Sequence, residues 1–152
     1  MPPLAETLHP AKPDDTLELD ELWSFVRCKE DRAWVWVALC RRTRHVVGLW
    51  VGGRTESDCY EFRNSIDAAY RGCATVSDFL ASYPNVFAAN GHVACGKESG
   101  ETAHVERWNN TLRQRLGRFV RKTLSFSKSW AMHILTLRWF VHVYNTSISV
   151  AC

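Results

Sequence analysis

Three acidic residues have the side-chain type and the setting that metal ligands require. Asp20 lies between Leu19 and Leu22 in an apolar stretch, where a carboxylate is costly unless it is paired, hydrogen-bonded or bound to a cation. Asp78 ends another apolar stretch, and Glu106 lies in the first turn of a predicted helix, where a carboxylate also gains from the helix dipole. Each has a plain structural explanation by itself, but the three together favour a shared cation site.

Carboxylates that converge within a few ångströms repel one another, and hard divalent cations relieve that repulsion. Mg²⁺ accepts carboxylate oxygens, keeps several of its waters and binds substrate phosphate. Two such ions about 3.5–4 Å apart can hold the attacking and leaving oxygens of a phosphodiester displacement. The acidic trio therefore predicts metal-dependent chemistry on a phosphodiester.

A strongly basic segment follows Glu106. From Arg107 to the C-terminus there are eight Lys or Arg and no Asp or Glu, whereas the preceding residues carry eleven basic and sixteen acidic side chains. This asymmetry indicates a polyanionic partner, for which we expect DNA, although a basic surface that serves only solubility is the alternative. The residues expected to bind DNA are Arg107, Asn110, Arg113, Arg118, Arg121, Lys122 and Lys128.

Composition is that of a globular chain. Of 152 residues, 46% are hydrophobic and 23% are charged, which is sufficient for one domain with a core. No run approaches the roughly 18 apolar residues of a membrane span, and the N-terminus lacks the apolar core of a signal peptide, so we expect a cytoplasmic protein. None of the six cysteines has zinc-knuckle spacing, and most lie in apolar stretches, so they are expected to be reduced and buried. A zinc site at His92, Cys95 and His104 is disfavoured by its spacing.

The elements that must position the acidic residues follow from the apolar patterns. Strands are predicted over 17–26, 33–41, 45–51, 73–79 and 85–89, the first three as antiparallel hairpins. A capping box at Thr55 and Asp58, followed by apolar positions at helical spacing to Ala69, predicts the first helix. Three further helices are predicted over 80–84, 102–122 and 128–145, and Ser125 or Ser127 is expected to cap the last one. A loop is expected over 90–101.

This order of elements predicts an α/β fold with a mixed five-stranded sheet and helices on both faces. Asp20 and Asp78 would lie side by side if the first and fourth strands pair. Residues 1–16 contain four prolines and little apolar pattern, so we expect a flexible arm there, a single domain over 17–146 and a short tail over 147–152.

Three segments resemble a known family. "ELDELWSF", "VSDF" and above all "GKESGETAHVERWNNTLRQRLGRFVRKTLSFSKS" are similar to the catalytic domain of insertion-sequence-one-type bacterial transposases, which belong to the DDE class with a ribonuclease-H-like fold. The resemblance covers about residues 17–145. It implies that Asp20, Asp78 and Glu106 are the catalytic, metal-binding trio and hold two Mg²⁺ or Mn²⁺ ions. The implied activity is DNA cleavage at element ends and transfer of the freed 3′-hydroxyl into target DNA. The implied location is the bacterial cytoplasm, in association with the nucleoid when the protein is bound to DNA.

The sequence departs from the family pattern in two places. Phe79 and Leu80 follow Asp78, where the family often shows a Gly or a second polar residue, and Asp67 is the nearest competitor for the second aspartate. Family members also carry an upstream zinc-binding and helix-turn-helix region, often encoded in a separate frame and joined by frameshifting. The resemblance thus implies a downstream-frame product or truncated copy, partnered by such a protein or fusion and acting as a homodimer or larger assembly on DNA. A nuclease of the same superfamily and an inactive DNA-binding remnant or modulator are the alternatives.

Overall fold

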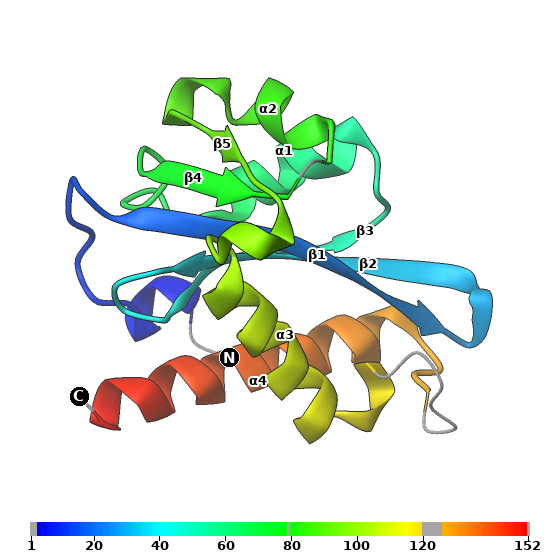
Figure 1. Ribbon diagram of the computed structural model, residues 1–152. Coiled ribbons are helices and arrows are strands. Elements are labelled where there is room, and N and C mark those ends of the chain that lie inside the picture. The colour runs from blue at the N-terminus through cyan, green and yellow to red at the C-terminus, as the bar shows by residue number, and fades with distance from the viewer. Residues whose placement is uncertain (1–2, 79, 120–125, 152) are drawn as a thin grey trace.

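A single mixed sheet organises the computed structural model, which describes residues 3–78, 80–119 and 126–151 (Figure 1). Its strands are β1 (Thr16–Val26), β2 (Cys28–Cys40), β3 (Val46–Gly52), β4 (Ala74–Ser77) and β5 (Val93–Ala94), in the order β3-β2-β1-β4-β5. The first three pair antiparallel, whereas β4 is parallel to β1 and β5 is parallel to β4. The expected α/β class with a mixed five-stranded sheet is confirmed, and it is consistent with a ribonuclease-H-like fold.

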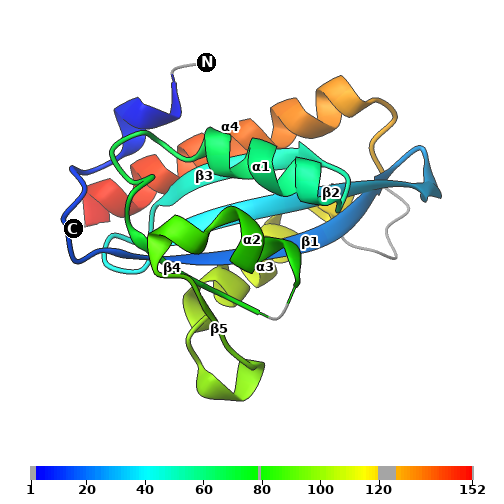
Figure 2. The ribbon, with the colours of Figure 1, turned by 90° about the horizontal axis from the view of Figure 1, so that it is seen from above.

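Helices cover both faces of the sheet, with α1 and α2 on one side and α3 and α4 on the other (Figures 1 and 2). The α-helices are α1 (Glu56–Ser65), α2 (Ser82–Val86), α3 (Ala103–Arg115) and α4 (Trp130–Ala151). Short 3₁₀ helices occupy η1 (Leu4–Thr7), η2 (Ala88–Asn90), η3 (Lys97–Ser99) and η4 (Gly117–Phe119). Of the described residues, none belongs to a helix long and apolar enough to cross a membrane.

Strands β1 and β2 are apolar on both sides because each side of the sheet is covered. Leu17 and Leu19 of β1 belong to the core under α1 and α2, whereas Leu22 belongs to the core under α3 and α4. The α1/α2 core contains a ring cluster in which Trp36 lies 5.7 Å, centroid to centroid, from both Phe62 and Tyr83. Burying such large rings supplies much of the driving force for folding. The acidic residues of β1 are therefore held in a rigid central strand.

The predicted fifth strand over 85–89 is wrong. Residues 85–86 end α2, and Ala88–Asn90 forms η2, while the true fifth strand is Val93–Ala94 within the expected loop. The run is apolar because Phe87 is fully buried against Phe62 and Tyr83, and its backbone N–H donates to the Tyr83 carbonyl at 2.9 Å. A short apolar run serves a buried helical turn as well as a strand, and periodicity alone does not distinguish them.

Helix boundaries also differ from the sequence expectations. The Thr55–Asp58 capping box is confirmed, but α1 ends at Ser65 rather than near Ala69, and Pro84 lies inside α2 rather than ending it. A proline in the first turn is tolerated because its missing N–H would have no helical partner there. Helix α3 ends at Arg115 and η4 follows it, so the predicted helix over 102–122 is shorter than expected. Ser129, not Ser127, caps α4, because its hydroxyl accepts the N–H of Met132 at 3.1 Å; Ser125 lies outside the described residues.

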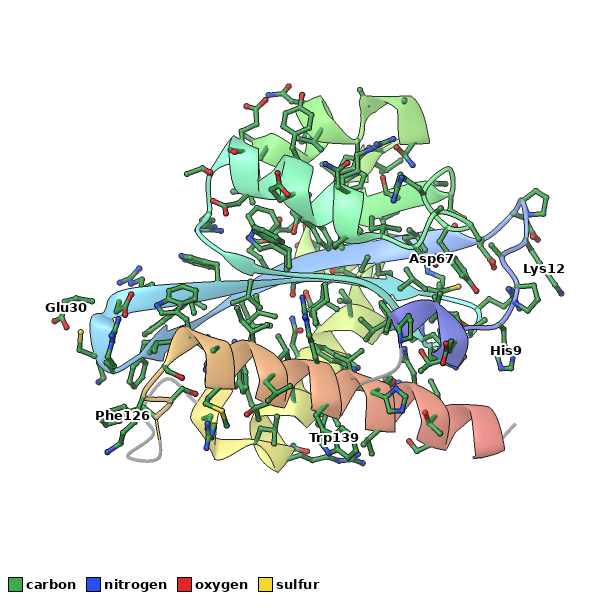
Figure 3. All side chains as sticks on the ribbon, turned by 180° about the vertical axis from the view of Figure 1, so that it is seen from behind. His9, Lys12, Glu30, Asp67, Phe126 and Trp139 are labelled. Carbon is green, nitrogen blue, oxygen red and sulfur yellow. The ribbon has the colours of Figure 1, made fainter. Side chains whose placement is uncertain are left out.

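The N-terminal residues pack against the domain. Leu4 contacts the core under α3 and α4, His9 stacks on His45 with centroids 4.8 Å apart, and Asp15 pairs with Arg42 at 2.6 Å. Figure 3 shows His9 and Lys12 along this segment and Trp139 on the outer side of α4. At the other end, α4 continues to Ala151, through most of the residues expected to form a tail.

The described cysteines are free. Cys40, Cys59 and Cys73 are buried, as expected, but Cys28 is exposed at the start of β2. Cys28 follows Arg27, whose positive φ of 65° makes the tight turn between β1 and β2. It is therefore a hairpin residue and not part of the core.

Candidate active site

The parallel pairing of β1 with β4 brings two aspartates together. Glu18 of β1 is level with Val76 of β4, and the pairing stops there because β4 ends at Ser77. Asp20 and Asp78 each come two residues later, so the same register places them level at the end of β4. Beyond this point β1 continues without β4 beside it, as Figure 1 shows, which leaves that edge of β1 open to the acidic residues.

A third carboxylate, which the sequence reasoning did not select, joins the pair. Among the described residues, Asp20, Glu21 and Asp78 each offer one carboxylate oxygen, and these oxygens all lie within 4.8 Å of one another. Glu21 points to the opposite face of the sheet from Asp20, where Tyr83 Oη donates to its Oε2 at 2.6 Å and Arg54 pairs with its Oε1 at 2.8 Å. Glu21 is therefore held in place at the edge of β1 by two other elements.

Asp20 is the most perturbed of these carboxyl groups. Its pKa is raised from 3.8 to about 7, first by burial and then by the neighbouring negative charges of Glu21 and Asp78, with a smaller contribution from Glu106. Burial also raises the pKa of Glu21, with Asp78 adding to the effect, whereas Tyr83 and Arg54 oppose it. Such shifts are typical of functional sites, where the fold holds like charges close together.

Helix α3 contributes the other wall of the site. Asn109 Nδ2 donates to Asp20 Oδ2 at 2.8 Å, and the Glu106 carboxylate, which accepts a hydrogen bond from Thr102 at 3.2 Å, faces the same cleft. Glu106 stands outside the 4.8 Å group but lines a cleft of about 560 Å³ with all three of its members. The residues lining this cleft are Asp20, Glu21, Leu22, Trp23, Arg32, Trp34, Arg54, Asp78, Glu106, Asn109, Asn110 and Arg113.

Glu18 attaches the start of α3 to the strand that carries Asp20. Its buried carboxylate accepts the backbone N–H groups of His104 at 2.9 Å and Val105 at 3.2 Å, and its second oxygen lies 2.7 Å from His104 Nδ1 and 3.1 Å from Arg41 Nε. These N–H groups have no partner within the helix, so an anion there is favourable. Glu18 thus fixes the position of the first turn of α3, including Glu106, relative to β1.

The residues predicted to bind DNA are divided between different surfaces. Asn110 and Arg113 line the acidic cleft, while Arg118 and Lys128 line a second cavity between η4 and α4. Arg107 is exposed on α3. Arg121 and Lys122 lie outside the described residues.

The donor set fits a hard divalent cation. Carboxylate oxygens are the ligands that Mg²⁺ and Mn²⁺ prefer, and a cation between Asp20 and Asp78 would relieve the repulsion that raises the Asp20 pKa. The competitor Asp67 has no part in this cleft: it follows α1, where its backbone N–H donates to Val47 at 2.9 Å. His92 forms hydrogen bonds with the hydroxyls of Thr75 and Ser77, whereas His104 Nδ1 contacts Glu18, so the two histidines have separate partners.

Sequence reasoning missed Glu18, Glu21 and Asn109. The signal for the first two is the segment "ELDE", in which three carboxylates interrupt a strand whose other positions are apolar. Buried carboxylates require partners, so all three could have been considered together. Asn109 lies three residues after Glu106, on the neighbouring part of the helix. Its partner, Asp20, is brought to it by the packing of α3 on β1, which the sequence does not show.

Comparison with known proteins identifies the family. A family model described as IS1 transposase matches residues 16–146. The chain is 36% identical to the insertion element iso-IS1n protein InsB of Shigella dysenteriae over 82% of its own length and 92% of that protein. It is 32% identical to the IS1 protein InsB of Shigella flexneri over 83% and 93%, and 29% identical to the IS1 4 protein InsB of Escherichia coli K12 over 83% and 73%. The chain belongs to the IS1 transposase family.

Proposed function

We propose that this chain is the catalytic subunit of a DNA transposase that cuts DNA at the ends of an insertion element and joins the freed 3′-hydroxyl to target DNA. The observation that carries the proposal is the proximity of Asp20 and Asp78, whose carboxylate oxygens lie within 4.8 Å of each other just beyond the end of β4, in a cleft that Glu106 also lines. Family membership, which implies a DNA substrate and dependence on divalent metal, supports it.

Asp20, Asp78 and Glu106 would hold two Mg²⁺ or Mn²⁺ ions, with Glu21 beside them. When bound, such ions supply charge neutralisation and alignment of the attacking and leaving oxygens of a phosphodiester. The role of Asn109 is to orient the Asp20 carboxylate through its 2.8 Å hydrogen bond. Glu18 sets the position of Glu106 by anchoring α3.

Residues of the cleft would place the DNA strand against the carboxylates. Asn110 and Arg113 offer amide and guanidinium donors to phosphate oxygens, and Arg107, Arg118 and Lys128 extend the basic surface beyond the cleft. In strand transfer, the 3′-oxygen of the element end forms a bond to a phosphorus of the target DNA, while the bond between that phosphorus and the target's own 3′-oxygen breaks. The attacking hydroxyl loses its proton, and the leaving 3′-oxygen gains one. One phosphodiester replaces another, so no external energy source is needed.

We further propose that at least two copies act together on DNA, because two element ends must be joined to one target. An upstream-frame zinc-finger and helix-turn-helix protein, or a fusion with it, would recognise the element ends. Residues 17–146 would form the catalytic domain of such an assembly, associated with the bacterial nucleoid.

The test is Glu106→Gln in a strand-transfer assay with pre-cut element ends and plasmid target. The variant should lose joined products and retain non-specific DNA binding, because it changes one carboxylate and leaves the basic surface intact. Glu61→Gln, at an exposed position on α1, is the matched control and should transfer like the unaltered protein. Retained joining by Glu106→Gln would overturn the assignment, and cut but unjoined DNA from the unaltered protein would favour the nuclease alternative.

A further inference from the structure

Two arginines on the strand side of the acidic cleft are each stacked on a tryptophan. The Arg32 guanidinium lies 5.0 Å from the centroid of the Trp23 ring, and the Arg54 guanidinium lies 4.5 Å from that of Trp34. Trp23 and Trp34 are direct cross-strand partners in the β1–β2 register, so the two stacked pairs are neighbours. All four side chains line the cleft that contains Asp20, Asp78 and Glu106.

Stacking fixes a guanidinium in space without using its N–H groups. An indole face attracts the cation and holds its plane, while the N–H edge remains able to fork onto a phosphate. The two arginines differ in their ion pairing. Arg54 also pairs with Glu21 and keeps 44% of its side chain exposed. For Arg32, no carboxylate within the described part of the chain lies at ion-pair distance.

Arg32 and Arg54 approach the cleft from the opposite face of the sheet to Arg113. Trp34 packs with the core under α1 and α2. Trp23 is the cross-strand partner of Trp34, and Arg32 lies two residues before Trp34 on the same strand, so both side chains lie towards that face of the sheet. Asn110 and Arg113 come from α3, which covers the other face. Cationic side chains thus line the acidic cleft from both faces of the sheet.

A cleft with four carboxylates repels a phosphodiester unless cations are placed beside it. We propose that Arg32 and Arg54 bind phosphate groups of the DNA strand that occupies the acidic cleft. They lie on the wall of the cleft that the β-sheet forms, across from Arg113 on α3. The inference rests on the proposed function and extends it, because the DNA-binding residues expected from the sequence all lie after Glu106. The ligand is the sugar–phosphate backbone, so these contacts position the strand and read no base sequence.

The experiment is a salt titration of DNA binding by the full chain, with a fluorescent duplex that carries no element end and a single strand of equal length. Arg32→Gln removes one phosphate contact, so the slope of log affinity against log salt for the duplex should become shallower by about 0.9. Equivalently, the loss of affinity between 50 and 200 mM NaCl should be about 3- to 4-fold smaller than for the unaltered protein. Arg138→Gln removes the same charge from an exposed site on α4, away from the cleft, and should keep the original slope.

A second pair of variants preserves charge. Arg32→Lys and Arg54→Lys should keep most of the salt slope but bind more weakly, because a lysine can neither stack flat nor fork onto a phosphate. Lysine is used at position 54 so that Glu21 keeps a cationic partner. Should Arg32→Gln and Arg32→Lys both bind with the affinity and slope of the unaltered protein, the inference is wrong. Absence of salt-dependent binding by the unaltered protein would instead contradict the proposed function itself.

Discussion

The Glu18 carboxylate makes two contacts with His104: its Oε1 accepts the His104 backbone N–H at 2.9 Å, and its Oε2 lies 2.7 Å from the ring Nδ1. This relationship joins two segments separated by more than half of the chain. Through it, the strand that carries Asp20 determines where the helix that carries Glu106 begins. Geometry at the candidate site therefore depends on a buried residue that does not line the cleft itself.

Glu18→Gln is predicted to impair catalysis more than DNA binding. A neutral amide cannot accept all four hydrogen bonds, so the start of α3 should shift, and a misplacement of about 1 Å can cost roughly 100-fold in rate. Strand-transfer rates at saturating DNA should fall strongly while the affinity for non-specific DNA stays the same. Thermal or denaturant unfolding should show a loss of about 2–4 kcal/mol, because buried donors lose an anionic acceptor.

Glu101→Gln is the control for this prediction. Glu101 pairs with the same Arg41 but is exposed, so the pair contributes little and the variant should lose less than about 1 kcal/mol. If Glu18→Gln and Glu101→Gln behaved alike in both assays, Glu18 would have no special role in positioning α3.

His133 should make the protein less stable in mild acid. Its ring is buried between Ser24, 2.8 Å from Nε2, and Ser127, 2.6 Å from Nδ1, and burial lowers its pKa to about 4. The unfolded chain, with a pKa near 6.5, binds this proton more readily, so the free energy of unfolding should fall as pH falls from about 6.5 to 4, by up to about 3 kcal/mol. Denaturant titrations across this range should show a flatter profile for His133→Gln, and an unchanged profile would contradict the assignment.

Asp20 contributes a pH dependence of the opposite sign. Its folded pKa of about 7 lies above the usual 3.8, so its contribution to stability is present below about pH 4 and is lost as pH rises through 7. Without divalent ions, Asp20→Asn should therefore gain stability relative to the unaltered protein as pH rises, by up to about 4 kcal/mol. A constant difference between the two proteins from pH 4 to 8 would show that Asp20 is not perturbed.

Asn145 should be a major stabilising contact of α4. Its side-chain amide is fully buried, accepts the backbone N–H of Val46 at 2.9 Å and donates to the Val46 carbonyl at 3.0 Å, as a neighbouring strand would. Asn145→Ala leaves both backbone groups of β3 without these partners, and the expected cost is about 2–4 kcal/mol by denaturant titration. Thr146→Ala, at an exposed position on the same helix, should have little effect.

The sequence allowed the central part of the fold to be predicted because its signals are local. Apolar runs rich in Val, Leu and Trp in 17–26, 33–41 and 45–51, separated by short polar connections, identify the antiparallel strands, and the capping box at Thr55 identifies the start of α1. The segment around residue 87 was misassigned because a buried helical turn and a buried strand are both apolar. Strand β5 is only two residues long, too short for any pattern to show.

Candidate site residues were selected from the sequence only where their own local context was unusual. Asp20 stands out in an apolar strand and Glu106 precedes a basic segment, but the roles of Glu18 and Asn109 depend on contacts between β1 and α3. Arg32 and Arg54 have no local feature that marks them, because their setting is produced by the register that places Trp23 beside Trp34. Long-range pairings of this kind arise from packing and leave no periodic pattern.

The most direct test of the central claim, that Asp20, Asp78 and Glu106 share divalent ions, is Mn²⁺ binding measured by electron paramagnetic resonance near pH 8. The unaltered protein should bind Mn²⁺, and Asp20→Asn, Asp78→Asn and Glu106→Gln should each weaken the affinity by roughly 10- to 100-fold or more, whereas Glu61→Gln should not. Binding should also weaken as pH falls below about 7, because protons then compete for Asp20. Equal Mn²⁺ affinity in the unaltered protein and in Asp20→Asn and Asp78→Asn would contradict the account.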